Sequence, residues 1–488
     1  MRALRIVLIV AFAVAVSGCG AKKQSAASGG AELVSATAPI FVSIDSDLNS
    51  DQWQQVDELF RKFPIRSEAL ASLRSSLEEE TGLDYEQDVK PALGDEIDLV
   101  WLDFANDGSN AVALTKPKDE AAFKQMIEKG NAKDPGEDPL LFEEQDGWFV
   151  LSDTQQKIDR FQAQSEGDKL ADDDLYNDAL AELPDDSLVH VFARGRSIVE
   201  ALQDVPEMTP FQLGADQKPE FLSAALAAEG SGLRLVGAGR AEAEPKAPIE
   251  PFESKFLDDV PADAVAFLTF RGGEEFEQQM EKLQREGDFG PELDQLERMF
   301  GFRLENLVDI FSHEVALYVR PGSPIPEVTV LVDAPDEQEV LRRANVTLRA
   351  LTKDFPTQPC HAPAEEAGVP VTCTDLGVVQ LRTAGFDDKV VITIGQDAIS
   401  KLRGDGPRLS DEEGFKSARD AAGLPDETAG FMWLDFEDGL PLILGLAEAG
   451  GESIPADIRA NLEPLGSFLT WADTDGRNGS FTAFLQID

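Results

Sequence analysis

The sequence repeats itself, and this repeat is the feature that most limits the possible folds. Five segments of the N-terminal half have counterparts, in the same order, in the C-terminal half. The clearest pair is LADDDLYNDALAELPDD, residues 170–186, and LSDEEGFKSARDAAGLPDE, residues 409–427. The other pairs are 38–45 with 261–270, 82–102 with 301–319, 111–127 with 328–344, and 148–161 with 390–402. Collinear matches at this long spacing predict two copies of one domain and not a solenoid of short repeats.

Each copy mixes strands and helices in the same order. In the first copy, short alternating strands are expected over 97–102 and 111–114. A helix is expected over 52–63, where apolar residues recur on one helical face. The segment Pro-x-Asp-Glu at 117–120 begins another helix, because proline and acids suit a first turn. Adjacent strands joined by short turns predict an α+β class, in which each domain is a mainly antiparallel sheet with helices packed on one face.

The domain boundaries follow from composition. The segment AEAEPKAPIEPFES, residues 241–254, is rich in proline, alanine and glutamate and is the expected joint between the copies. We therefore predict a first α+β repeat domain over 38–245 and a second over 246–488.

The N-terminus has the pattern of an exported lipoprotein. Arg2 and Arg5 precede an apolar run over 6–16, which is shorter than the roughly 20 residues that a spanning helix needs. The run ends in Val-Ser-Gly-Cys19, which resembles the bacterial lipobox. This resemblance implies cleavage before Cys19 and acyl chains such as palmitate on its thiol. The alternative is an ordinary secretory signal with an incidental cysteine.

These features predict where the mature protein lies. We expect a lipoprotein signal peptide over 1–18 and a flexible tether over 19–37, which is rich in serine, glycine and alanine. Two or more acyl chains hold a protein firmly on a bilayer. The chain is therefore expected outside the cytoplasm, anchored by lipid to a bacterial membrane.

The charge of the chain limits its partners. Its 92 acidic and 43 basic residues give a net charge of −49, which repels nucleic acid and anionic membranes. The acids either serve solubility, as in a salty habitat, or include a cation site. The best calcium candidate is the alternating array of oxygen donors Asp45, Asp47, Asn49 and Asp51. Its loop glycine is replaced by serine, so a polar turn that caps the following helix is the competing interpretation.

Two further cysteines, Cys360 and Cys373, are expected to form a disulfide in an oxidising compartment. The alternative is a metal site that includes His361. A structural zinc site needs four ligands, however, and no second Cys/His pair lies nearby in the sequence.

Signatures of catalysis are absent from the sequence. There is no Gly-x-Ser-x-Gly, no Ser-x-x-Lys and no phosphate-binding Gly-Lys-Ser/Thr loop. His190 and His313 fall in strand-like segments and are interpreted as structural. No catalytic residue and no cofactor are therefore expected, although a hydrolase that uses two carboxylates remains an alternative among so many acids.

Three stretches resemble a known family: SIDSDLNSDQWQQVDELFRKFP, GDEIDLVWLDF and the Leu-Pro-Asp-Asp segment at 183–186. They are similar to bacterial envelope proteins grouped as domain of unknown function 3352, over roughly residues 36–488. The resemblance implies an extracytoplasmic setting, often with a lipoprotein signal. It brings no defined activity and no catalytic residue.

Three functions are compatible with these observations. The first is a non-catalytic interaction or structural module of the cell envelope, with an unknown envelope protein as partner. The second is a carrier for an apolar ligand, since the 29 phenylalanines could line a lipid-sized groove. The third is the carboxylate-based hydrolase.

Overall fold

The computed structural model describes residues 29–104, 108–133, 139–203, 218–245, 249–272, 313–322, 325–352, 358–360, 365–377, 379–451 and 453–488. Cys19, the apolar run before it and His361 lie outside the described residues. Within the described ranges, no helix is both long enough and apolar enough to cross a membrane.

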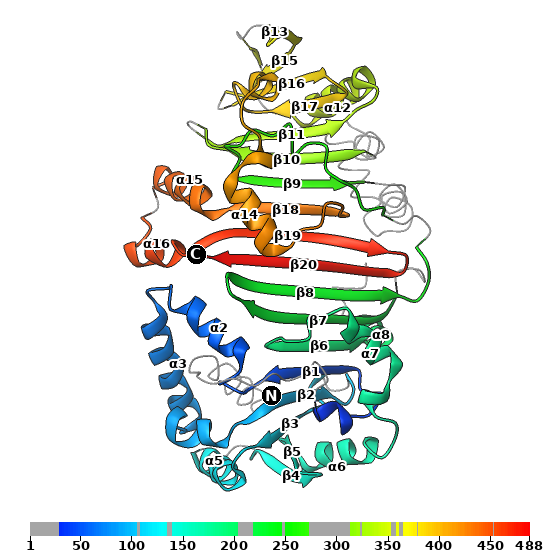
Figure 1. Cartoon of the computed structure of the whole chain (residues 1–488), viewed down its shortest axis with the longest axis vertical. Coiled ribbons are helices and arrows are strands. Elements are labelled where there is room, and N and C mark those ends of the chain that lie inside the picture. Colours follow the sequence, from blue (N-terminus) through cyan, green and yellow to red (C-terminus); the bar gives the residue numbers. More distant parts are fainter. Residues whose placement is uncertain are drawn as a thin grey trace.

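One large antiparallel sheet of eighteen strands forms the centre of the described structure (Figure 1). Strands of the first half follow one another in space as β4 (Leu141–Gln145), β5 (Trp148–Ser152), β3 (Ala111–Pro117), β2 (Gly94–Trp101), β1 (Ile40–Asp45), β6 (Val189–Arg194), β7 (Pro219–Glu229) and β8 (Gly232–Ala241). The sheet continues into the second half as β20 (Asn478–Ile487), β19 (Leu465–Asp475), β18 (Gly430–Asp435), β9 (Ala266–Arg271), β10 (Glu314–Arg320), β11 (Glu327–Asp333), β17 (Lys389–Thr393), β16 (Gln380–Phe386), β15 (Thr372–Asp375) and β12 (Gln358–Pro359). A separate hairpin pairs β13 (Glu365–Glu366) with β14 (Val369–Pro370).

The α+β class and the antiparallel pairing are confirmed, but two separate sheets are not. β8 pairs with β20 from Arg240–Asn478 to Gly232–Gln486, so the two halves meet edge to edge. An edge strand presents unpaired N–H and C=O groups, and pairing two such edges satisfies both rows. We call this contact the seam. The strand order outward from it is the same in both halves, with β7, β6, β1, β2, β3 and β5 matching β19, β18, β9, β10, β11 and β17.

Helices cover both faces of the sheet, which corrects the expectation that they pack on one face. In the first half, α2 (Asp51–Phe60), α3 (Arg66–Thr81) and α5 (Glu120–Lys133) pack on the side chains of Ile97, Leu99 and Phe149. α6 (Gln155–Gln164) and α7 (Asp174–Ala181) pack on the opposite face, on Val100 and Val112. Successive side chains of a strand point to opposite faces, so a run such as Ile97–Trp101 supplies two cores.

The second half is built in the same way. α13 (Ala398–Arg403) and α14 (Glu413–Ala422) share a core with Ala316 and Tyr318, and α12 (Glu337–Leu351) packs with Val315 on the other face. Three more helices are α8 (Gly195–Gln203), α15 (Phe436–Ala449) and α16 (Ala456–Leu462). Short helical turns are η1 (Gly29–Glu32), η2 (Tyr85–Val89), η3 (Lys90–Ala92), η4 (Leu170–Asp172) and η7 (Leu409–Asp411).

The prediction of a flexible tether over 19–37 is wrong from residue 29 onward. Ala31 and Val34 are buried in the core with α6 and α7. The Val34 carbonyl accepts a hydrogen bond from the Leu170 N–H at 2.8 Å, and Ser35 forms a β-bridge with Lys169. This part of the segment is therefore folded against the first half.

The second half holds an equivalent segment in the same way. The Val260 carbonyl accepts from the Leu409 N–H at 2.8 Å, and Pro261 bridges to Arg408. The two segments thus enter their halves through matching contacts.

Candidate functional site

The oxygen-rich array before α2 is organised as a helix cap. The Asp47 N–H donates to Asp45 Oδ1 at 2.8 Å, and Lys118 Nζ donates to Asp47 Oδ1 at 3.1 Å. Ser50 is the N-cap residue, and its Oγ accepts from the Trp53 N–H at 3.3 Å. No group of three or more His, Cys, Asp or Glu side chains is placed to hold a metal among the residues that the structure describes. Helix capping therefore accounts for the array that includes Asn49 and Asp51.

Asp45 has an unusual environment for a carboxylate. Burial raises the pKa of Asp45 to about 6, although hydrogen bonds from the Ser50 side chain and the Asp47 N–H oppose the shift. The carboxyl group is held by the turn that caps α2.

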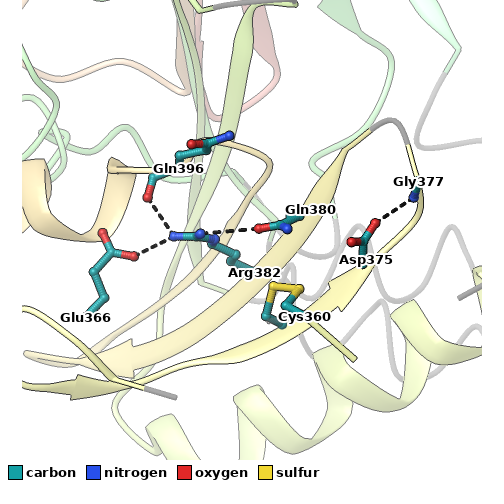
Figure 2. Close-up of a disulfide and its surroundings, with 8 residues drawn as sticks. Cys360, Glu366, Asp375, Gly377, Gln380, Arg382 and Gln396 are labelled. Atoms are coloured by element: carbon teal, nitrogen blue, oxygen red, sulfur yellow. Dashed lines mark hydrogen bonds and ion pairs between the residues drawn. A yellow bond between two sulfur atoms is a disulfide. The ribbon is translucent and has the colours of Figure 1, made fainter. Parts of the chain in front are cut away.

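The expected disulfide between Cys360 and Cys373 is present, with the two Cα atoms 5.6 Å apart (Figure 2). Cys373 lies opposite Arg382 on the neighbouring strand β16. The Arg382 guanidinium donates to Glu366 Oε2 at 2.9 Å and to the Gln396 carbonyl at 2.6 Å. Glu366 Oε1 also accepts from Ser400 of α13. The disulfide and this ion pair therefore fasten the outer strands of the second half.

The two described histidines lie far apart. His190 is in β6, where its Nε2 lies 3.0 Å from the Pro184 carbonyl oxygen. His313 is exposed and immediately precedes β10. The six strands β7, β8, β20, β19, β18 and β9 lie between β6 and β10. The resulting seven inter-strand steps amount to about 34 Å at the usual strand spacing. These two side chains cannot share a site.

Two buried glutamates, which the sequence reasoning did not single out, occupy equivalent places in the two halves. Glu96 in β2 accepts from the Gly29 N–H at 3.1 Å and from Ser43 Oγ at 3.2 Å. Glu314 in β10 is fully buried and accepts from the Lys255 N–H at 3.1 Å and from Thr269 Oγ1 at 3.1 Å. Each carboxylate holds the segment that enters its half.

Asp98 lies two residues after Glu96 on the same face of β2 and is also buried. This pair is the arrangement that the carboxylate-hydrolase alternative requires, but η1 lies directly on it. A Cβ atom on Gly30 would lie only 1.7 Å from Asp98 Oδ2. A residue larger than glycine at position 30 would therefore displace the Asp98 carboxylate, against which η1 packs.

An apolar cavity lies on the other face of the same sheet. It has a volume of about 60 Å³ and is partly open, between α5 with η3 and the strands β2, β3 and β5. The residues that line it are Thr81, Leu83, Ala92, Leu93, Ile97, Ala113, Leu114, Thr115, Phe123, Met126, Ile127, Gly130, Asn131, Leu140 and Leu151.

The polar side chains that line the cavity form hydrogen bonds with other groups of the protein. Thr81 Oγ1 donates to the Leu77 carbonyl at 2.6 Å, and Thr115 Oγ1 donates to the Glu96 carbonyl at 3.1 Å. The Asn131 amide exchanges two hydrogen bonds with the backbone of Leu140. A buried water needs two to four polar partners, so this wall favours hydrocarbon over water.

The sequence of α5 explains the shape of the cavity. Phe123, Met126 and Ile127 follow the i, i+3, i+4 spacing and point to one side of the helix. The Phe123 ring packs on Phe149 of β5, with their centroids 4.8 Å apart, and closes one part of the space. An empty cavity of this volume lowers the free energy of unfolding by about 1.4 kcal/mol, at ~24 cal/mol per Å³. An apolar group bound in the cavity would restore that stability.

Comparison with known proteins finds a similarity to one family in the N-terminal part of the chain. Residues 2–158 match the model of a family described as protein of unknown function (DUF3352). The chain is similar to this family over these residues, which confirms the resemblance seen in the segments 43–64 and 94–104. The matched range is shorter than the 36–488 expected, but it contains every residue that lines the cavity. No protein with curated annotation matches the sequence.

Solved structures give only distant similarity. Crystal forms III and IV of TP0453 share 13% identity with this chain, with a TM-score of 0.25, and cover 47% of this chain and 79% of that chain. Crystal form I has a TM-score of 0.23 at 13% identity and covers 45% of this chain and 73% of that chain.

Proposed function

We propose that this protein is a lipid-anchored extracytoplasmic module of the bacterial cell envelope that binds an apolar ligand without chemical change. The observation that carries the proposal is the cavity beneath α5, whose polar lining groups are already satisfied. At about 60 Å³ the cavity is too small to enclose a lipid, so it would take only the end of one hydrocarbon chain through its open side, by shape and hydrophobic burial alone. It favours the carrier function over a purely structural module.

The anchor and the location are supported by the N-terminal sequence. A basic start, a short apolar run and the small residues before Cys19 fit a lipoprotein signal. The Cys360–Cys373 disulfide fits an oxidising compartment. Incorporation of labelled fatty acid, and its loss on Cys19→Ser, tests the anchor.

We further propose that the two halves are copies of one ancestral domain. The matching strand order, the equivalent glutamates Glu96 and Glu314 and the equivalent entering segments support it. In this proposal the copies share a fold, while the described cavity belongs to the first copy.

Ligand binding is tested with the purified full chain and decanoate as probe. Ala113 lines the cavity, so Ala113→Leu fills part of it; Ala121→Leu adds the same bulk on the exposed side of α5. We expect decanoate to raise the midpoint of thermal unfolding of the parent and of Ala121→Leu. Binding to Ala113→Leu should be weaker by about tenfold or more.

Mass spectrometry of organic extracts from native protein should also yield a co-purified lipid from the parent and not from Ala113→Leu. If no lipid is extracted, and decanoate binds all three chains equally or none of them, the cavity is not a ligand site. The structural-module function would then take its place.

A further inference from the structure

Strand β4 is the last strand of the sheet in the first half, and Figure 1 shows it at the end of the sheet opposite to β15. Among the residues that the structure describes, β4 pairs with β5 alone. A two-residue turn at 146–147 joins the two strands, so Gln145 and Trp148 exchange both of their hydrogen bonds. Backbone groups alternate in direction along a strand, and those of Phe142 and Glu144 therefore point away from β5. We call these outward N–H and C=O groups the free edge.

The second half shows what an edge of this geometry can hold. β16 and β17 are joined by the same kind of two-residue turn, at 387–388, so Thr383 of β16 corresponds to Phe142 of β4. β15 pairs antiparallel with the outer side of β16 and places Thr372 opposite Thr383. The same hairpin, with the same register, therefore accepts one more antiparallel strand in this fold.

The first half replaces part of that strand by a side chain. The Asn131 amide exchanges two hydrogen bonds with the backbone of Leu140, at 2.8 and 3.0 Å. Leu140 corresponds to Leu381, which lies opposite Thr374 of β15. The amide thus fills one place of the added strand. In the part of the chain that the structure describes, no group is hydrogen-bonded to the free edge itself.

The side chains beside the free edge define what would pair with it. Phe142 and Glu144 are two residues apart, so both side chains lie on the face of the sheet that carries α5. The Phe142 ring packs on Phe123 and Phe149, with centroids 5.8 and 5.5 Å away, and stays half-buried. Glu144 is exposed. An added antiparallel strand would therefore fit best with a basic residue opposite Glu144 and an apolar residue two positions later.

Charge disfavours a second copy of this chain as the partner. Pairing of two β4 strands would bring Glu143 and Glu144 of one chain close to those of the other, in chains that each carry a net charge of −49. The outermost strand at the other end of the sheet, β12, contains Pro359, which has no N–H to donate. Short edge strands with charged residues protect a sheet against self-pairing. A basic strand is attracted by the same charges.

We propose that the free edge of β4 binds an extended basic segment of another protein as an additional antiparallel strand. Each of its two residues offers one N–H donor and one C=O acceptor, and these supply the affinity. The side chains of Phe142 and Glu144 supply the preference for sequence. Because the contact is short, binding is weak and reversible. The inference is independent of the cavity and of the lipid anchor.

The test uses the full chain and a fluorescein-labelled peptide, Gly-Thr-Lys-Thr-Val-Thr-Gly, whose binding is followed by fluorescence anisotropy. Glu144→Pro removes one outward N–H and leaves the bonds between β4 and β5 in place. Glu144→Gln is the matched control, because it keeps that N–H and removes only the charge. We expect binding to be weaker by about tenfold or more in Glu144→Pro. In Glu144→Gln it should be weaker by only about two- to fivefold, since an exposed ion pair contributes little.

Two measurements on the unchanged chain do not depend on the folding of a variant. A peptide that is N-methylated at its valine lacks the donor for the Phe142 carbonyl and should bind about tenfold more weakly. The parent peptide should slow hydrogen exchange at the Phe142 and Glu144 amides. It should leave the Thr383 amide unchanged, because Thr383 is already paired with Thr372.

Three results would overturn the proposal. Equal binding of the two peptides, or equal binding by Glu144→Pro and Glu144→Gln, would assign the attraction to charge alone. Absence of binding, or binding without protection at Phe142 and Glu144, would show that this edge takes no strand. A chain that sediments as a dimer, with the two amides already protected and no peptide present, would assign the free edge to self-association.

Discussion

Asp45 shows how one side chain can work against the stability of the fold. Its pKa is about 6 in the folded protein, above the 3.8 of an unperturbed aspartate, and burial is the main cause. The folded state therefore binds the proton more tightly than the unfolded chain does. It follows that Asp45 destabilises the fold progressively as the pH rises from about 4 through about 6.

Asp45→Asn should therefore stabilise the protein at neutral pH. A shift of about two pKa units corresponds to roughly 3 kcal/mol. Partial exposure and altered hydrogen bonds reduce this, and we expect a gain of about 1–2 kcal/mol in the free energy of unfolding at pH 7. The gain should disappear near pH 4. Urea unfolding at the two pH values measures it, and an equal gain at both would contradict the assignment.

Asp47→Asn is the matched control in the same turn. Burial raises the pKa of Asp47, but hydrogen bonds from the Asn49 N–H and Lys118 outweigh burial and lower it. Asp47 thus contributes stability at neutral pH that is lost as the pH falls. The variant should be less stable than the parent at pH 7, which is the opposite sign to Asp45→Asn.

A pair of interacting residues can be predicted from the sequence when few residues of that type are present. The prediction fails when many are present. The disulfide was predictable because Cys360 and Cys373 are the only cysteines of the sequence besides Cys19. Glu96 and Asp98 were not, because acids that alternate with Ile97 and Leu99 look like the solvent side of a strand. In the structure η1 covers that side of β2, and the sequence of the strand gives no sign of it.

At the scale of elements, the segment before β9 depends on Glu314. This carboxylate accepts hydrogen bonds from Ser254 Oγ, the Lys255 N–H and Thr269 Oγ1. Glu314→Ala would take this acceptor from Ser254 Oγ and the Lys255 N–H, while Thr269 Oγ1 can still donate to the Val315 carbonyl. We expect a loss of about 3 kcal/mol or more in the free energy of unfolding, since each unsatisfied buried group costs about 1–3 kcal/mol.

Glu314→Gln should cost less, because one amide oxygen can still accept. Hydrogen exchange of the Lys255 amide should become faster in both variants, and most in Glu314→Ala. Glu339→Ala removes an exposed glutamate from α12 and should leave this exchange rate unchanged. Unchanged exchange at Lys255 in Glu314→Ala would show that other contacts hold the segment.

Elements with strong local signals were predicted well. The strands expected over 97–102 and 111–114 correspond to β2 and β3. α5 begins at Glu120, where Asp119 accepts from two N–H groups of the first turn. The expectation that Pro117 belongs to the first turn is wrong, because Pro117 is the last residue of β3 and pairs with Gly94. Residues 29–37 were missed because serine, glycine and alanine dominate them. Their packing depends on a few small and aliphatic side chains, such as Ala31 and Val34, that are buried against the core of the first half.

At the scale of the whole molecule, the seam could not be deduced from residue types. A duplicated antiparallel domain has edge strands in each copy, and the sequence does not say whether two edges meet. The β8–β20 pairing uses backbone groups, which every residue except proline supplies. The sequence nevertheless predicted the repeat itself, because the five matched segments preserve core and turn positions.

Arg234 is a side chain that binds the two halves across this seam, and it provides the test of their coupling. From β8 it donates to the carbonyls of Ala422 at 2.7 Å and Ala421 at 3.3 Å, at the end of α14, and its guanidinium lies 5.1 Å from the centroid of the Phe484 ring. Because the sheet is continuous, we expect the parent to unfold in a single calorimetric transition. Arg234→Ala should cost about 2–3 kcal/mol and split that transition into two.

Arg240→Ala is the control on the same strand. Arg240 pairs with Asp178 and Glu220 and lies over Phe221, all within the first half. Its loss should lower stability while leaving one transition, because no contact across the seam is removed. If Arg234→Ala also unfolds in one transition, the backbone pairing of β8 with β20 is sufficient to make the two halves one cooperative unit.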